Sequence, residues 1–439
     1  MRVAIVAEVF LPKIDGVVIR TMNLIRHLRE SGDDVLVICP EADERGDCGV
    51  ALAEFPAFPF VAYPEYRIGT PDDRLLSRLD EFRPDVLHFL NPFAFGFRCH
   101  DLLQRHGRRY PCVFSFHTLY GEFVKRYPLL RPLSKMLWWM TKQYHNQADM
   151  NLTVSGTMQR ELAARGFERV ALWPPAVDSC LFAPDRASAE MRTMLSGGEP
   201  DRPLLLTVSR LAPEKNVEFL HSVMQKLPQA KLAIVGDGPH RGVLESKFAD
   251  VDAVFHGYLK GEQLASAYAS ADAFVYASET ETMGNVILEA MASGAPVVAP
   301  RAGGIPSLVD HEETGLLFEP GDADTAARLA GRLLDDSILR SMISRSARNA
   351  VEETGWRQSI DQVRECYRRT IASALSRSAP RLHRRSRMAA VAVRGLVTAF
   401  RVVSPRGVLR DRLTIRESAR AKSDDSIPVT APEAVSVST

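Results

Sequence analysis

The sequence predicts an α/β protein made of two successive doubly wound units that face a deep cleft between them. Short apolar strands rich in Val, Ile and Leu alternate with amphipathic helical segments, which is typical of parallel sheets covered on both faces. A polar stretch interrupts this alternation, which then restarts over a similar length. At 439 residues the chain is long enough for two or three domains.

The first unit is expected over residues 1–183. It opens with an apolar strand at Arg2–Glu8, and helical periodicity follows at Val18–Ser31. Later buried strands are expected at Asp34–Cys39, Asp85–Leu90, Cys112–Phe116 and Met150–Val154.

A linker is expected over residues 184–202, which are polar and rich in Pro and Gly. The second unit follows over residues 203–355, with late helices at Asp322–Asp335 and Ser337–Glu352. Its strands are expected at Leu204–Val208, Lys231–Val235, Ala253–Phe255, Ala273–Tyr276 and Pro296–Ala299. In doubly wound folds, ligands bind at the carboxyl ends of the strands, so two facing units place the site between them.

The tail at residues 377–439 has a different composition. Between Arg377 and Lys422 there are 13 Lys or Arg residues against two acids, and the last residues are rich in Ser, Thr, Pro and Val. This composition predicts a basic and largely disordered segment.

Composition sets limits on compartment and partners. The net charge is +1, so nothing in the overall charge favours nucleic acid. Six scattered cysteines indicate reduced thiols, and the N-terminus lacks the pattern of a signal peptide. No apolar run reaches the roughly 18 residues that span a bilayer. We expect a cytoplasmic protein, either soluble or peripheral on the inner face of the membrane.

The most informative motif is Ser278–Gly294, which follows an apolar strand. Gly284 marks a turn, a helix begins after it, and Glu281 and Glu289 stand on either side of the turn. The helix N-terminus exposes N–H groups that attract anions, while carboxylates accept protons from hydroxyls. The motif therefore predicts a ligand that carries both phosphate and sugar hydroxyls.

Two cations follow the first strand of the second unit. Arg210 and Lys215 could hold a diphosphate and stabilise its charge as it leaves; the alternative is a loop with solvated charges. In the first unit, Gly16 follows the first strand and His117 follows a later one. Both could face the cleft, although a tight turn and a structural histidine are the simpler interpretations.

Two further segments of the second unit are weaker candidates. Ile234–Arg241 contains a Gly-rich turn that lacks the full GxGxxG pattern. We interpret this turn as structural packing, and its backbone could also contact a nucleotide. Tyr258 and Leu259 could line a pocket for a base, but packing in the core is an equal alternative.

Lys125–Lys142 is a candidate membrane surface. It holds five basic residues, no acid, and the adjacent Trp138 and Trp139. Basic side chains with tryptophan are typical of helices that lie on anionic lipid. The alternative is an ordinary helix whose tryptophans lie in the core.

Taken together, these motifs resemble the retaining glycosyltransferases of the GT-B class, in the family with the E-x7-E motif (glycosyltransferase family 4 type). The match covers about residues 1–372 and includes ETMGNVILE, Arg210 with Lys215, and APVVAPRAGGIPSLVDHEETGLLFEPGD. LPKIDGVV, YPEYR, FHT and YHNQADMNLTVS are most similar to glycolipid-forming members, the sulfoquinovosyl-diacylglycerol synthases and GDP-mannose-dependent α-mannosyltransferases. The implied fold is two Rossmann-like domains, an acceptor-side one followed by one that binds the nucleotide sugar.

The resemblance implies roles for the second-unit residues. Arg210 and Lys215 would bind the donor diphosphate, Glu281 the hydroxyls of the transferred hexose, and Glu289 the ribose. Further donor contacts would come from Tyr258, Leu259, Met283, Gly284 and Asn285.

It also implies roles on the first-unit side. Gly16 would lie near the diphosphate, and His117 near the transferred sugar and the reacting centre. A helix over residues 356–376 would cross back onto the first domain. One departure from the family pattern is Pro174–Asp178, where Ala176 replaces the usual Gly. This departure bears on the acceptor side of the cleft and not on donor binding.

The expected activity is transfer of a hexose from a UDP or GDP sugar to a hydroxyl, with retention of configuration. The acceptor is expected to be a membrane lipid or a lipid-linked glycan, and neither a metal nor another cofactor is expected. His117, Arg210, Lys215 and Glu281 form the expected catalytic set. Alternatives are a soluble enzyme that acts on a small natural product or sugar, and an inactive module that binds the donor.

Overall fold

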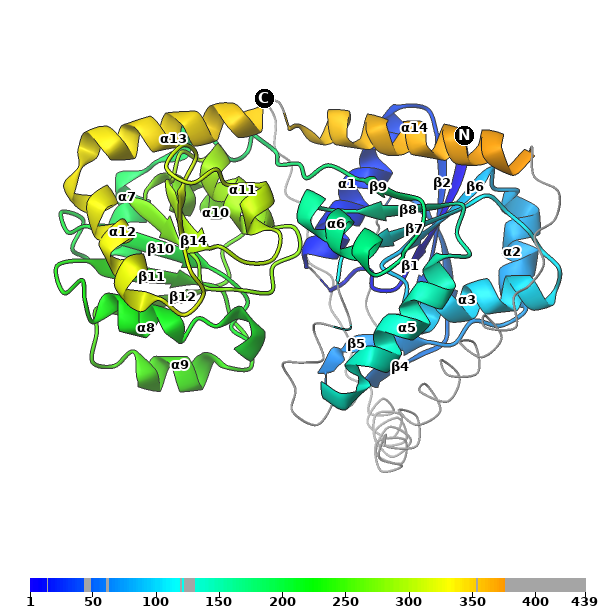
Figure 1. The fold of residues 1–439 in the computed structure, drawn as a ribbon, viewed down its shortest axis with the longest axis horizontal. Helices are drawn as coiled ribbons and strands as arrows, with labels where there is room; N and C mark the ends of the chain where they lie inside the picture. Colours follow the sequence, from blue (N-terminus) through cyan, green and yellow to red (C-terminus); the bar gives the residue numbers. More distant parts are fainter. Residues whose placement is uncertain are drawn as a thin grey trace, which may run out of the picture.

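The computed structural model describes residues 1–13, 15–42, 49–60, 63–118, 121, 131–352 and 354–375. They form two α/β units that lie side by side, with the first on the right of Figure 1 and the second on the left. The basic tail and Lys125 to residue 130 lie outside the described residues, so the structure does not test what the sequence predicts for them.

The first unit is a parallel sheet with helices on both faces and an added antiparallel hairpin. Its sheet strands are β1 Arg2–Ala7, β2 Asp34–Pro40, β3 Ala51–Phe55, β6 Val86–Leu90, β7 Cys112–Phe116, β8 Met150–Thr153 and β9 Val170–Leu172. The hairpin is β4 Ala57–Phe60 with β5 Tyr63–Gly69. The helices are α1 Gly16–Glu30, α2 Arg74–Phe82, α3 Ala94–Arg105, α5 Ser134–His145 and α6 Gly156–Ala164, and a short 3-10 turn, η2 Arg131–Leu133, precedes α5.

The second unit repeats the architecture. Its strands are β10 Leu204–Val208, β11 Lys231–Val235, β12 Ala253–Gly257, β13 Ala273–Val275, β14 Val297–Pro300 and β15 Leu316–Phe318. Its helices are α7 Ala189–Leu195, α8 Phe219–Met224, α9 Arg241–Lys247, α10 Gly261–Ala269, α11 Asn285–Ala292, α12 Ala323–Asp335 and α13 Ser337–Glu352. Short 3-10 turns are η3 Pro184–Arg186, η4 Pro213–Lys215 and η5 Ile305–Ser307.

The strand orders are those of doubly wound sheets. The first runs β3-β2-β1-β6-β7-β8-β9 and the second β12-β11-β10-β13-β14-β15, with parallel pairing throughout both. The order reverses beside β1 in one sheet and beside β10 in the other, and such switch points open a crevice at the carboxyl ends of the strands. The predicted fold class is therefore confirmed, and Gly16, Arg210 and Lys215 all follow a switch-point strand.

The stretch predicted as a linker packs onto the second unit. Residues 184–202 contain η3 and α7, and Leu195 is fully buried in the same apolar cluster as β10. Arg192 holds the stretch in place, since its guanidinium donates to the Asp272 carboxylate at 2.9 Å and to the Ser270 carbonyl at 2.9 Å. The Pro and Gly content hid a short helix whose apolar side is covered.

The last described helix, α14 Trp356–Leu375, lies against the first unit, whereas α13 lies against the second (Figure 1). Ile360, Val363 and Tyr367 are buried in one apolar cluster with residues of β1 and α1. Arg364 adds an ion pair to Asp33, with Nε 2.8 Å from the carboxylate. The chain therefore crosses back to the first unit, in line with the expectation for residues 356–376.

Candidate active site

The loop between β13 and α11, called here the Glu281 loop (residues 278–284), is built as the sequence predicts. Gly284 has φ +75° and directly precedes the first turn of α11. The backbone N–H of Gly284 donates to Glu281 Oε1 at 3.3 Å. A left-handed backbone at this point favours glycine. The loop also packs against the turn at Gly303, where a Cβ would lie 2.2 Å from the Glu281 carbonyl oxygen. Glu281 is thus held by its backbone on one side and by the helix N-terminus on the other.

Lys215 and Glu281 form an ion pair at the carboxyl ends of the second sheet. Lys215 Nζ lies 2.9 Å from Glu281 Oε2, and the Tyr276 hydroxyl donates to the same oxygen at 2.7 Å. Burial is the largest single influence and opposes both charges, but the partner ion and the Tyr276 hydroxyl, joined for Glu281 by the Gly284 N–H, together outweigh it. The pKa of Lys215 is therefore raised, and the pKa of Glu281 is lowered to about 2. Both groups are therefore charged at neutral pH, and together they can hold one anionic and one hydroxyl-bearing part of a ligand.

Glu289 differs from Glu281 in its electrostatics. It lies in α11, is half-buried, and accepts a hydrogen bond of 3.0 Å from the Tyr268 hydroxyl. Burial raises the pKa of Glu289 to about 7, against the smaller opposing effect of the Tyr268 hydroxyl. A carboxylate that is this costly to ionise gains from any ligand hydroxyl that donates to it.

The loops after β10, β11 and β12 are joined by backbone contacts. Leu211 N donates to the Asp237 carbonyl at 3.0 Å, and a Cβ on Gly236 would lie 1.9 Å from the Ser209 carbonyl oxygen. This confirms the packing role predicted for Ile234–Arg241. Arg210, half-buried, is in the first of these loops.

Tyr258 and Leu259 follow β12 at the same edge of the sheet. Tyr258 is 59% exposed, and its hydroxyl donates to the Asp237 carbonyl at 2.9 Å. Leu259 is half-buried against the apolar cluster of the second unit. The exposed ring of Tyr258 remains accessible to a base, while Leu259 fits the core-packing alternative better.

The Glu281 loop touches the first unit at His117. The Thr282 hydroxyl donates to the His117 backbone carbonyl at 2.7 Å, and Met283 packs in an apolar cluster with Phe116 and Val154 of the first unit. The predicted site residues of the two units therefore lie next to each other. His117 itself is 5% exposed, and burial, followed by the charge of Arg20, holds its pKa well below its usual range.

A second contact joins Gly16 and Asn285. Gly16 is the first residue of α1, and a Cβ there would lie 3.0 Å from Asn285 Nδ2. The space beside Gly16 is thus occupied by a side chain of the second unit, and the contact with a diphosphate expected for Gly16 stays a prediction. Asn285 Oδ1 is buried and has no hydrogen-bond partner among the described residues.

Arg20 lies behind this junction and was not predicted. It is fully buried in α1, donates to the carbonyl oxygens of Trp173 and Pro174 at 2.9 and 2.7 Å, and lies 2.7 Å from Met283 Sδ. Burial lowers its pKa to about 9. A single side chain thereby connects α1, the segment leaving β9 and the Glu281 loop.

The tryptophan pair in Lys125–Lys142 does not form a membrane-facing surface. Trp138 is 9% exposed, packs beside Phe167 and is covered by the guanidinium of Arg165, 4.0 Å from its ring. Trp139 is half-buried against the core of the first unit. The alternative interpretation of this helix is therefore the correct one for the tryptophans, which leaves its exposed basic residues, such as Lys135, available to a partner.

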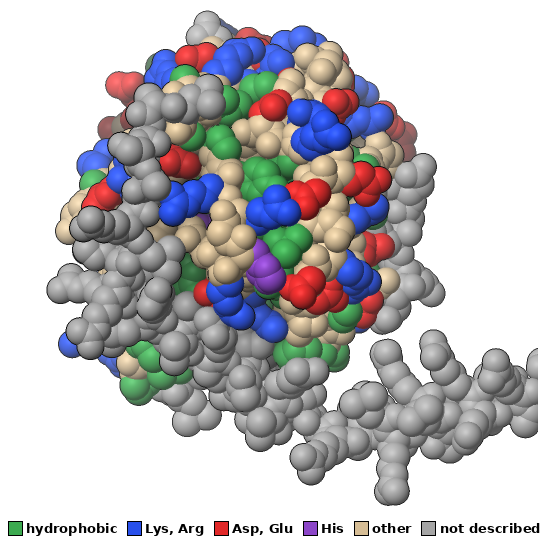
Figure 2. All heavy atoms as spheres, turned by 90° about the vertical axis from the view of Figure 1, so that its right-hand side faces the viewer, with side chains coloured by type: hydrophobic (Ala, Val, Ile, Leu, Met, Phe, Trp, Pro, Cys, Tyr) green, Lys and Arg blue, Asp and Glu red, His purple; other side chains and the backbone are tan. Residues whose placement is uncertain are grey.

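The outer surface of the first unit carries charges of both signs, as Figure 2 shows for one face. Several are paired, such as Arg74 with Asp72 at 2.9 Å and Arg108 with Asp80 at 2.6 Å. Mixed, paired charges favour solubility over binding of one polyanion. No helix within the described ranges is both long and apolar enough to cross a membrane.

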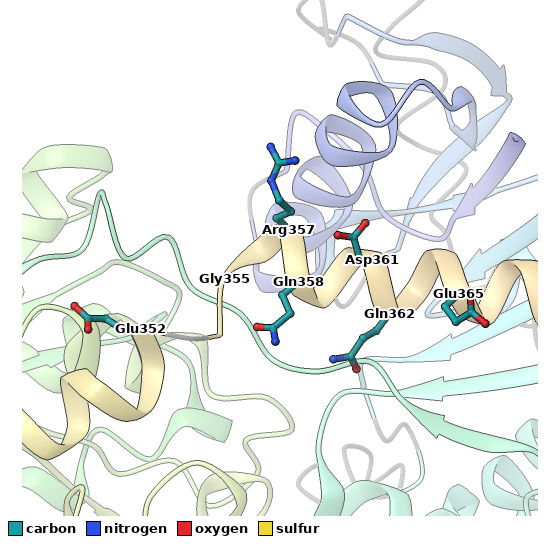
Figure 3. Close-up of a pocket in the computed structure, with 7 residues that line it drawn as sticks. All are labelled: Glu352, Gly355, Arg357, Gln358, Asp361, Gln362 and Glu365. Atoms are coloured by element: carbon teal, nitrogen blue, oxygen red, sulfur yellow. The ribbon is translucent and has the colours of Figure 1, made fainter.

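A hollow of about 590 Å³ lies where α13 ends and α14 begins (Figure 3). The residues that line it are mostly charged or amide residues, such as Glu352, Arg357 and Asp361. None of its residues belongs to the predicted site, and it marks the crossing of the chain between the units.

Family models match both units. A model described as Glycosyltransferase Family 4 matches residues 14–179, and one described as Glycosyl transferases group 1 matches residues 196–350. The solved structure of sucrose-phosphate synthase from Thermosynechococcus elongatus aligns with a TM-score of 0.69 at 22% identity, over 85% of this chain and 99% of that one. At this identity the likeness concerns the fold alone. The fold and site define a GT-B glycosyltransferase.

Curated relatives narrow the class. The chain is 38% identical to the sulfoquinovosyl transferase SQD2 of Arabidopsis thaliana over 80% of its own length and 70% of the relative. It is 39% identical to the GDP-mannose-dependent alpha-mannosyltransferase of Mycolicibacterium smegmatis, over 73% and 84% of the two chains. The chain belongs to glycosyltransferase family 4, a family of retaining enzymes, and its relatives include glycolipid enzymes.

Proposed function

We propose that this chain transfers a hexose from a UDP or GDP sugar to a hydroxyl of a membrane lipid or lipid-linked glycan. The observation that carries the proposal is the Lys215–Glu281 ion pair, held beside His117 through Thr282. A cation for the diphosphate, a carboxylate for hexose hydroxyls and a buried histidine thus meet at one junction between the units. In this proposal Glu289 takes the ribose, and Arg210 shares the diphosphate with Lys215.

The chain's own groups can assist departure of the nucleotide. Preorganised cations and N–H groups stabilise the negative charge that develops on the leaving diphosphate. Such electrostatic stabilisation of the transition state is usually the largest single contribution to the rate. Lys215 is already fixed by Glu281, so it needs no rearrangement to act. The proposal includes no metal and no other cofactor, and full activity in excess chelator is the expected result.

The donor is tested by binding and transfer together. Purified protein is titrated with UDP-glucose, UDP-sulfoquinovose and GDP-mannose, since a donor at about 100 times its Kd stabilises the folded state by about 2.7 kcal/mol. Lys215→Ala and Glu281→Ala should abolish transfer with the fold intact by circular dichroism. Lys226→Ala is the matched control, because Lys226 is an exposed lysine paired with Asp324. Unchanged transfer in both site variants would contradict the proposal.

The acceptor is tested separately. Lipid and water-soluble acceptors are offered with the donor that binds, and flotation with anionic vesicles at moderate salt tests contact with a membrane. We expect the full chain to float and a variant ending at residue 376 to bind less, because the basic tail would then be missing. Transfer to soluble sugars alone, without flotation, would favour the soluble enzyme.

A further inference from the structure

The chain crosses between the two units twice, and the two crossings meet. Trp173 is buried in the apolar cluster of the first unit and Val177 in that of the second, so the first crossing lies between them. The second crossing lies between Val351, buried in the second unit, and Trp356, buried in the first. Val177 N donates to the Thr354 carbonyl at 3.3 Å, which joins the two crossings. A side chain at this place can therefore influence how the units lie relative to each other.

Arg20 contacts both crossings from the first unit. Its Nη2 donates to the carbonyl oxygens of Trp173 and Pro174 at 2.9 and 2.7 Å, and its Cζ lies 4.1 Å from the centre of the Trp173 ring. The centre of the Trp356 ring is 5.8 Å from the same atom. Ser359 of α14 also donates to the Pro174 carbonyl, at 2.7 Å, so this oxygen joins α1, the first crossing and α14.

The same guanidinium reaches the Glu281 loop of the second unit. Arg20 Nη1 lies 2.7 Å from Met283 Sδ, and Met283 is itself buried. Thr282, directly before Met283, donates to the His117 carbonyl at 2.7 Å. Arg20 and His117 thus hold adjacent residues of the loop, next to Glu281, and a displacement of Met283 would move the backbone that carries Glu281.

Burial of Arg20 is unfavourable for stability. The side chain is fully buried, and its pKa of about 9 still leaves it charged at neutral pH. Within the described part of the chain it pairs with no carboxylate, its Nε has no partner, and the Met283 thioether is only a weak acceptor. A buried cation with incomplete compensation lowers the free energy of unfolding. Residues that break the local rules in this way are typical of functional sites.

We propose that Arg20 is a positioning residue for hexose transfer, which fixes the Glu281 loop relative to His117 by binding the loop and both crossings. The inference rests on the proposed function for the reaction, and on the contacts of Arg20 alone for the position of the loop. Lys215 and Glu281 are paired with each other within the second unit, so their hold on the donor should survive the loss of Arg20. The transfer step should not, because it also needs the first unit.

Amide hydrogen exchange of the ligand-free protein tests the position of the loop. We expect exchange in peptides that cover residues 278–284 to become at least about threefold faster in Arg20→Met and in Met283→Leu. The first variant removes the charge at similar length, and the second removes the sulfur at similar volume. Arg364→Met is the matched control, because Arg364 is also largely buried but pairs with Asp33 of the first unit. Unchanged exchange in both loop variants would overturn the inference, and Met283→Leu keeps the test valid if Arg20→Met does not fold.

Kinetics with the donor that binds follow on the same variants. We expect kcat to fall at least about tenfold in Arg20→Met while the Kd of the donor changes by less than about twofold, and both to stay unchanged in Arg364→Met. A general loss of structure would not separate kcat from Kd in this way. A loss that lies wholly in the Kd of the donor would overturn the inference. A wild type that transfers no hexose, with the expected change of exchange in the variants, would support the role of Arg20 in holding the loop and contradict the proposed function.

Discussion

The Thr282 hydroxyl donates a hydrogen bond of 2.7 Å to the backbone carbonyl of His117, across the junction between the two units. Thr282 follows Glu281 directly, so the bond fixes the distance between the ion pair of the second unit and the buried histidine of the first. Asn91 supports the same segment from the other side, since its side-chain oxygen accepts the His117 N–H at 3.1 Å. The Glu281 loop is thus joined to the His117 segment by one polar contact between the units, and a second contact within the first unit supports that segment.

Thr282→Val should lower transfer without unfolding the protein. The valine keeps the shape of threonine but leaves the His117 carbonyl without this donor, and one hydrogen bond is worth about 1 kcal/mol. We expect kcat/KM to fall roughly fivefold. Ser307→Ala is the control, because Ser307 makes another contact between the units, 2.7 Å to Thr157, that is exposed to solvent. Equal effects of the two variants on transfer would contradict a special role for Thr282.

Glu289 should make donor binding depend on pH. Its pKa is raised to about 7 by burial, and ribose hydroxyls donate a stronger hydrogen bond to the ionised carboxylate than to the protonated acid. Affinity for the nucleotide sugar should therefore rise, by up to about tenfold, from about pH 6 to about pH 8. Isothermal titration calorimetry measures this slope, which should be absent in Glu289→Gln. A wild-type affinity that is flat over this range would contradict the assignment.

The raised pKa of Glu289 also makes the free energy of unfolding depend on pH. A carboxyl whose pKa is higher in the folded than in the unfolded chain contributes stability below the unfolded value, near 4.5, and loses it as pH rises through about 7. The ligand-free wild type should lose thermal stability relative to Glu289→Gln over that interval. Glu281 behaves oppositely: its lowered pKa, about 2, keeps the pair with Lys215 ionised until the solution is strongly acidic.

Glu8 should be a large contributor to the stability of the first unit. Its buried carboxylate accepts the backbone N–H groups of residues 93–96, at the start of α3, at 2.8–2.9 Å, and the Tyr66 hydroxyl at 2.6 Å. Glu8→Ala leaves these donors unpaired and should lower the free energy of unfolding by about 3 kcal/mol. Exposed Glu41, which accepts one N–H from Ala57, is the control, with an expected loss below about 0.5 kcal/mol for Glu41→Ala.

Urea unfolding followed by tryptophan fluorescence measures this loss. The four tryptophans lie in the first unit or at the start of α14, so the signal reports on that unit rather than on the whole chain. A shift of the midpoint with an unchanged slope would indicate altered stability. Similar midpoints for Glu8→Ala and Glu41→Ala would contradict the prediction.

The sequence is sufficient to predict those strands and helices whose pattern of apolar residues is local. The predicted strands and late helices match within one or two residues, because each run of apolar residues is bounded by turn residues. β3, the β4–β5 hairpin, β9 and β15 were not predicted, and α7 was hidden among Pro and Gly. The spacing of Glu281 and Glu289 located the loop and helix for the same local reason.

The polar partners of the site could not be predicted in this way. Tyr276 and Tyr268 belong to apolar segments by sequence, and only tertiary packing brings their hydroxyls to Glu281 and Glu289. Arg20 carries a charge in the middle of an amphipathic helix, a pattern that predicts exposure, yet it is fully buried. Its carbonyl partners lie about 150 residues away in sequence, at Trp173 and Pro174, where no local pattern indicates an acceptor.

Gly303→Ala should weaken donor binding through the backbone of the Glu281 loop. Gly303 has φ +57°, and its Cβ would lie 2.2 Å from the Glu281 carbonyl oxygen, so the loop must move. Gly321→Ala is the matched control, because Gly321 has φ +83° but open space around its Cβ position. Both variants acquire left-handed strain of about 1–2 kcal/mol, but only Gly303→Ala displaces Glu281. We expect affinity for the nucleotide sugar to fall at least about tenfold in Gly303→Ala and to stay unchanged in Gly321→Ala by calorimetry. Equal affinities in the two variants would show that the position of the Glu281 backbone does not matter for the donor.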